Sequence, residues 1–171
     1  MTRRIAAGLF TSMLLCSTLA FGAGPFAEAK LEPTKGNTVA GTVSFKEDGG
    51  RIQVLARLTG LAPGAHGFHV HEKGDCTAPD AMSAGGHFNP DNQAHGHPQK
   101  GPHHAGDMVM LVADTSGKAD LLTELTGISI SGATGIVGKA VIVHAAPDDY
   151  ATQPTGNSGA RVACGVIALS R

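Results

Sequence analysis

The sequence predicts an all-β domain, an antiparallel sandwich or barrel built from short strands. Apolar and polar residues alternate in several short segments, the pattern of strands that bury one face. No segment beyond the N-terminal region combines sustained helical periodicity with capping residues. Glycine is abundant, with 24 residues among 171, and fits many turns between short strands. The length is typical of one domain.

Seven segments carry the strand pattern and follow one another at nearly regular spacing. Gly49 and Gly50 separate the first two, which predicts a tight β-hairpin. The predicted strands are residues 38–45, 51–58, 66–72, 107–113, 118–125, 139–144 and 161–169. Two long segments between them, 73–106 and 145–160, are rich in loop-forming residues, and irregular segments of this length are usually functional or disordered.

Residues 1–29 are predicted to be a secretory signal peptide, followed by one domain over 30–171. Arg3 and Arg4 precede an uncharged, mostly apolar run, and Ala27-Glu28-Ala29 matches a cleavage pattern. Cleavage after Gly22 fits nearly as well. The apolar run is short for a membrane span and no stop-transfer cluster follows, so we expect a periplasmic or secreted protein without stable membrane insertion.

The part that follows the leader contains two cysteines, Cys76 and Cys164. In an exported chain, two cysteines predict one disulfide, and the alternative is two free buried thiols. The net charge of the whole chain is −1, and no basic block exists to hold nucleic acid.

All nine histidines lie between residues 66 and 144, which indicates a metal site and favours two. His69 and His71 are two residues apart on a predicted strand, so their side chains share one face. With His144, at the end of another strand, they would form a nitrogen platform suited to copper.

A second group comes from the long loop and suits zinc. His104 and Asp107 can reach one ion from a tight turn, and His95 adds a second imidazole. A closed tetrahedral zinc site then requires one more ligand. His87 is the candidate, and as an imidazolate it could serve both metals, because two nearby cations stabilise the anion.

Five segments of the chain resemble copper/zinc superoxide dismutases, in order and with matching gaps. They are Gly67-Phe68-His69-Val70-His71-Glu72, Gly74-Asp75-Cys76-Thr77, Gly85-Gly86-His87-Phe88-Asn89-Pro90, His104-Ala105-Gly106-Asp107 and Gly159-Ala160-Arg161-Val162-Ala163-Cys164-Gly165-Val166-Ile167. The likeness covers residues from about Asn37 to Leu169, and the export signal resembles that of bacterial periplasmic members.

The resemblance implies a Greek-key β-sandwich, or flattened barrel, of about eight antiparallel strands with two long functional loops. It implies dismutation of superoxide to oxygen and hydrogen peroxide, with copper and zinc as cofactors and a possible homodimer. The implied copper ligands are His69, His71, His87 and His144, and the implied zinc ligands are His87, His95, His104 and Asp107. The remaining implied site residues are Arg161 as anion guide, His87 as proton carrier, Asp148 as the outer-shell partner of both metal sites, and a Cys76–Cys164 disulfide.

Some features depart from the family pattern. Segment 145–160 contains no Lys or Arg and carries Asp148 and Asp149, which leaves attraction of superoxide to Arg161 and to Lys73, Lys100 or Lys139. His97 and His103 are interpreted as exposed loop histidines, with extra metal capture as the alternative. His66 is interpreted as a structural partner of the ligand strand. On the sequence alone, Asp148 could join His95 to either His71 or His69.

Two other functions are compatible with a chain that binds copper and zinc. A non-enzymatic copper- or zinc-binding or metal-delivery protein could use the same fold, but all four copper positions and Arg161 are present here. A zinc hydrolase is disfavoured, because a closed set of four zinc ligands leaves no position for a catalytic water.

Overall fold

A computed structural model describes residues 26–170, which form nine strands and one short helix. The strands are β1 (Phe26–Pro33), β2 (Ala40–Asp48), β3 (Arg51–Thr59), β4 (Gly64–His66), β5 (Phe68–His71), β6 (Leu111–Ala113), β7 (Ala119–Leu125), β8 (Ala140–His144) and β9 (Arg161–Leu169). The helix, η1 (Met82–Ala84), is a single 3-10 turn.

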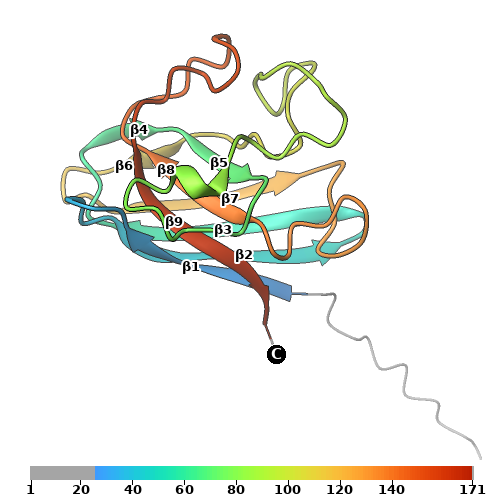
Figure 1. Cartoon of the computed structure of the whole chain (residues 1–171), viewed down its shortest axis with the longest axis horizontal. Helices are drawn as coiled ribbons and strands as arrows, with labels where there is room; N and C mark the ends of the chain where they lie inside the picture. Colours follow the sequence, from blue (N-terminus) through green and yellow to red (C-terminus); the bar gives the residue numbers. More distant parts are fainter. Residues whose placement is uncertain (1–25, 171) are drawn as a thin grey trace, which may run out of the picture.

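Seven strands form one curled antiparallel sheet in the order β5-β8-β9-β1-β2-β3-β7, and β4 pairs with β6 (Figure 1). The hairpin predicted at Gly49 and Gly50 joins β2 to β3. Other neighbours are distant in sequence: β3 pairs with β7, and β9 pairs with β1. The predicted antiparallel all-β class with two long loops is confirmed.

Alternation along the strands builds the core. In β3 every second side chain, from Ile52 to Leu58, is buried, while the residues between them face outward. Phe45 of β2 and Phe68 of β5 are fully buried and fill much of the interior. Because removal of apolar surface from water is the main stabilising contribution in folding, this inner face holds the sheet in its curled form.

Two predicted strands are shorter or divided in the structure. Segment 66–72 divides at Gly67, since β4 pairs with β6 whereas β5 pairs with β8. Gly67 lies so close to Ser158 that an added Cβ would collide with it. Of the predicted strand 107–113, only Leu111–Ala113 forms a strand, β6, because the chain first turns around Asp107.

Strand β1 was not predicted, and the domain boundary expected after Ala29 falls inside it. Ala27 and Ala29 are fully buried and pair with both β2 and β9. Cleavage after Ala29 would remove Phe26 to Ala29 from the sheet. The alternative cut after Gly22, like the predicted leader up to residue 25, lies outside the described residues.

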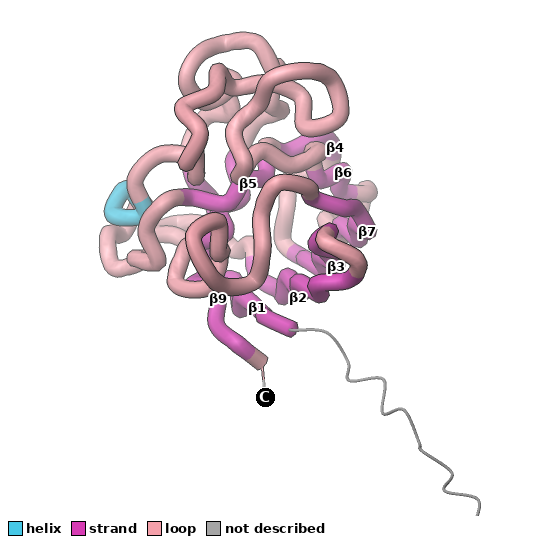
Figure 2. The backbone as a smooth tube through the Cα atoms, turned by 90° about the vertical axis from the view of Figure 1, so that its right-hand side faces the viewer, coloured by secondary structure: helices cyan, strands magenta, loops and turns pink. Residues whose placement is uncertain are grey.

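The two long loops lie at the same end of the molecule. The later part of segment 73–106, yellow-green in Figure 1, and segment 145–160, orange-red, rise above the strands in both views, whereas the first part of segment 73–106, which contains η1, lies beside the strands (Figures 1 and 2). Strands β5 and β8 run beneath them. Among residues 26–170, no helix has the length and apolar character needed to cross a bilayer.

Candidate metal centre

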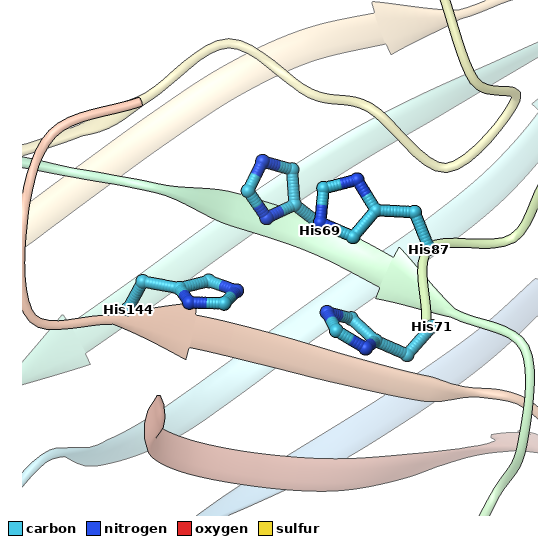
Figure 3. A group of neighbouring side chains, drawn as sticks. All are labelled: His69, His71, His87 and His144. Carbon is cyan, nitrogen blue, oxygen red and sulfur yellow. The ribbon is translucent and has the colours of Figure 1, made fainter. Parts of the chain in front are cut away.

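Four histidines converge from two paired strands and one loop. His69 and His71 alternate along β5 with core residues, so both imidazoles emerge on the face that the loops cover. His144 ends the neighbouring strand β8, and His87 comes from the loop, where it forms an isolated bridge with His71. Their rings point toward a common centre (Figure 3). One ligand atom from each lies within 4.8 Å of the other three.

Hydrogen bonds fix which nitrogen of each ring faces the centre. His69 Nε2 lies 2.6 Å from Asp148 Oδ2, His71 Nδ1 lies 2.9 Å from Gly85 O, and His144 Nδ1 lies 3.2 Å from Gly159 O. The nitrogens left without a partner are His69 Nδ1, His71 Nε2, His87 Nε2 and His144 Nε2. Buried polar atoms without partners are rare, so four on one centre fit a nitrogen-ligated cation such as copper.

The second group consists of His87, His95, His104 and Asp107, again within 4.8 Å of one another. Asp107 Oδ1 lies 2.8 Å from His87 Nδ1, and Oδ2 lies 3.0 Å from His95 Nδ1. The predicted turn is present, because the His104 N–H donates to Asp107 Oδ2 at 2.8 Å. Three imidazoles and one carboxylate match a closed zinc site. His87 belongs to both groups, as predicted.

Burial keeps the copper ligands His69, His71 and His144 in the form that binds metal. It lowers the pKa of His69 to about 4 and that of His144 to about 3. Both rings are therefore neutral at pH 7, and neutral imidazole is the form that binds metal. Burial would raise the pKa of Asp107, but hydrogen bonds from His87 and His95 outweigh it and hold that pKa well below its usual range.

Asp148 joins the two groups through their outer nitrogens. One carboxylate oxygen accepts from His69 Nε2 at 2.6 Å and the other from His95 Nε2 at 2.9 Å. The partner in the copper group is thus His69, which resolves the alternative with His71, whose Nδ1 bonds instead to Gly85 O. Such partners fix the tautomer and orientation of ligating imidazoles.

Arg161 begins β9 and is held beside the copper group. Its guanidinium donates to Ala81 O at 2.7 Å and to Gly85 O at 2.6 Å. Gly85 O also accepts from His71 Nδ1, so one carbonyl connects Arg161 to a copper ligand. Within residues 26–170, no carboxylate forms an ion pair with Arg161. Its remaining donors can face a small anion.

Lys35 shares a cavity lining with Arg161. Arg161 and Lys35 line one surface cavity of about 360 Å³, to which Asp80 also contributes, and sequence reasoning did not name Lys35. Lys139, one of the predicted guides, lies over the Phe88 ring at 4.0 Å.

The remaining histidines lie outside both ligand groups. His66 contacts the carbonyls of His144 and Ala62, both at 2.8 Å, and so supports the end of β8, in agreement with its interpretation. His97 and His103 are partly buried, whereas we expected exposed side chains. His97 packs against the Tyr150 ring at 4.5 Å, and His103 bonds to Gly101 O.

The predicted disulfide between Cys76 and Cys164 is present, with Cα atoms 5.8 Å apart and a sequence separation of 88. It joins segment 73–106 to β9, and Cys164 packs among small side chains that include Ala81 and Ala84. The bond thereby fixes the loop whose carbonyls hold Arg161.

Replacement of Cys164 by Ser is expected to lower the free energy of unfolding by about 2–5 kcal/mol, since the open chain gains conformational entropy. Denaturant unfolding of the metal-loaded variant beside the wild-type protein measures this. Chemical reduction of the wild-type protein should reproduce most of the loss. Equal stability of variant and wild type would show that the bond does not constrain the fold.

Comparison with known proteins agrees with this geometry. Residues 39–167 match the family model described as copper/zinc superoxide dismutase. The chain is 43% identical over 140 residues to superoxide dismutase [Cu-Zn] 3 of Arabidopsis thaliana, which covers 78% of this chain and 85% of the relative. It is 44% identical over 138 residues to superoxide dismutase [Cu-Zn] 2 of Brassica juncea, covering 77% and 90% respectively.

A solved structure of the clock protein EA4 superposes with a TM-score of 0.79 and 41% identity. The superposition covers 88% of this chain and 98% of that one. The likeness thus extends over nearly the whole described domain.

Proposed function

The chain belongs to the copper/zinc superoxide dismutase family, and from the leader pattern of residues 1–29 we propose that it works as an exported enzyme of the bacterial periplasmic type, protecting against superoxide from outside the cell. Its activity is the dismutation of superoxide to oxygen and hydrogen peroxide. One observation carries the activity: the unpartnered nitrogens of His69, His71, His87 and His144 converge on one centre, and His87 also belongs to the zinc group.

The two metals have different tasks. Bound copper supplies the redox chemistry, because it can accept an electron from one superoxide and return it to the next. The zinc group, which has four protein ligands and is closed, holds the loop and His87 in place. The division follows from the ligands, since the copper group contains imidazoles alone and the zinc group contains a carboxylate.

His87 is proposed to carry a proton. Formation of hydrogen peroxide consumes two protons, and the site has few groups that can provide one. His87 Nε2 faces the copper group while Nδ1 lies 2.8 Å from Asp107 in the zinc group. Held at Nδ1 by the zinc side, the ring can take up a proton at Nε2 and deliver it to the reduced substrate.

Arg161 is proposed to guide and hold the anionic substrate. Two of its donors are committed to the carbonyls of Ala81 and Gly85, which fixes the guanidinium plane. A permanent charge held in this way can hold a small anion beside the metal. Its closeness to the copper group is shown by Gly85 O, which accepts from both Arg161 and the copper ligand His71.

Export to the periplasm is supported by the leader pattern of residues 1–29 and by the disulfide, since such bonds persist in oxidising compartments. We propose that cleavage occurs after Gly22, because a cut after Ala29 would remove the buried Ala27 and Ala29 from β1.

The mature protein, exported by a bacterial host, is therefore expected to begin at Ala23. The intact mass of protein recovered from the periplasmic fraction measures the cut to a single residue. A mature chain that begins at Lys30 would contradict this site of cleavage. Full-length protein retained in the cytoplasm would contradict export itself.

A further inference from the structure

Gln153 pairs with the backbone of a zinc ligand through both ends of its side-chain amide. Its Oε1 accepts from the His95 N–H at 2.8 Å, and its Nε2 donates to the His95 carbonyl at 2.9 Å. No other hydrogen-bond partner of these two peptide groups occurs within the described part of the chain. The two residues are 58 positions apart, so the contact joins segment 73–106 to segment 145–160.

The backbones of His104 and His87, two other zinc ligands, are held in place without a side-chain amide like that of Gln153. His104 lies in a turn closed by Asp107, its partner in the same site. His87 pairs with His71 of β5 through an isolated bridge. His95 lies on neither a strand nor a turn and is only 3% exposed. Its backbone therefore depends on Gln153 for partners that the local chain does not provide.

The segment that carries Gln153 also holds the His95 ring. Asp148 accepts from His95 Nε2 at 2.9 Å. Gly156, at φ +65°, lies directly against this hydrogen bond, because an added Cβ would collide with both Asp148 and His95. Gly156 in turn donates to Thr152 O at 2.7 Å, which closes the segment into a compact turn. Backbone and ring of His95 are thus held by one turn.

The same segment orients two copper ligands. Asp148 accepts from His69 Nε2, and Gly159 O lies 3.2 Å from His144 Nδ1. The copper ligands are thus held by Asp148 and Gly159, whereas Gln153 contacts only the zinc ligand His95.

We propose that Gln153 is a positioning residue for the zinc site, which clamps the His95 backbone to segment 145–160 and so slows the release of zinc. It acts on a peptide group and carries no charge, unlike Asp148. The inference depends on the zinc ligand group and not on the roles proposed for His87 and Arg161.

Release of zinc from the copper- and zinc-loaded protein to an excess of chelator tests this. Gln153→Met keeps the length of the side chain and removes both hydrogen bonds. Zinc release is expected to be about tenfold faster, which corresponds to about 1.4 kcal/mol. Copper release should stay within about twofold of wild type, since no copper ligand contacts Gln153. The matched control is Gln99→Met. Gln99 is an exposed glutamine of segment 73–106, which also carries His95, and the Gln99 side chain forms no hydrogen bond within residues 26–170.

Thermal unfolding separates a role at the zinc site from general stabilisation. Gln153 is exposed, so its replacement leaves the core intact. We expect Gln153→Met to lower the Tm of the zinc-loaded protein clearly more than that of the metal-free protein. Zinc release equal to that of the Gln99→Met control, or equal losses of Tm with and without zinc, would overturn the proposal.

Discussion

The His144→Ala protein is expected to retain zinc, while its rate of superoxide dismutation falls by more than about a hundredfold. This loss exceeds the roughly 10- to 100-fold effect that is typical when a partner of a metal ligand, and not the ligand itself, is removed. His144 Nε2 points into the copper group, and His144 is absent from the zinc group. Three imidazoles would remain around copper, and β8 would keep its pairing with β5 and β9. The loss should therefore arise at the copper position alone.

Metal content and activity of the same purified sample check this result. His103→Ala provides a matched control, because His103 lies outside both ligand groups and bonds only to a neighbouring carbonyl. The control should keep both metals and full activity. Equal loss of zinc and copper from His144→Ala would show that the two groups are misassigned.

The Arg161→Gln protein is expected to have a kcat/KM about tenfold lower, equivalent to about 1.4 kcal/mol of transition-state stabilisation. The charge would be lost, and so would donors to the carbonyls of Ala81 and Gly85. Arg161→Lys should keep part of the activity, because it retains the charge without the planar set of donors. Copper content must be measured as well, since Gly85 O also holds His71.

Salt dependence separates guidance by charge from local structure. The wild-type rate is expected to fall only slightly as ionic strength rises, because segment 145–160 lacks Lys and Arg and Lys139 lies over Phe88. Arg161→Gln should flatten this dependence, whereas Arg57→Gln, on the outer face of β3, should not. An unchanged rate and salt dependence in Arg161→Gln would exclude Arg161 from the mechanism. A steep fall in the wild type would indicate guiding charges elsewhere.

The metal ligands could be predicted from the sequence because simple spacing determines where they point. Alternation along a strand places His69 and His71 on one face, and a three-residue step lets His104 and Asp107 share a turn. Both spacings are local, and the structure preserves them. These four ligands therefore did not depend on knowing how distant segments pack, whereas the complete sets with His87, His95 and His144 followed from the resemblance to the family.

What could not be predicted depends on contacts between distant segments. Asp148 had two possible partners, because a sequence does not show which nitrogen of His69 or His71 faces outward. Gln153 belongs to no motif, and its role follows only from the meeting of two loops. No sequence signal available to us could have identified it.

The strand predictions failed where another pattern competed with alternation. Small residues at Ala27 and Ala29 match a cleavage site, but they also suit the crowded interior between β2 and β9. Gly67 lies inside an apparently continuous alternating segment, yet the chain changes sheets there. In both places the packing of neighbouring strands decides the outcome, and that packing is not local in sequence.

One measurement tests the central claim most directly: the rate of superoxide removal by the mature protein loaded with copper and zinc, compared with the same protein loaded with zinc alone. We predict rapid, repeated turnover with both metals and none above buffer with zinc alone, because the group of His69, His71, His87 and His144 is assigned to copper. A fully loaded protein that removes superoxide no faster than buffer would contradict the account and indicate a protein that binds or delivers metal without turnover.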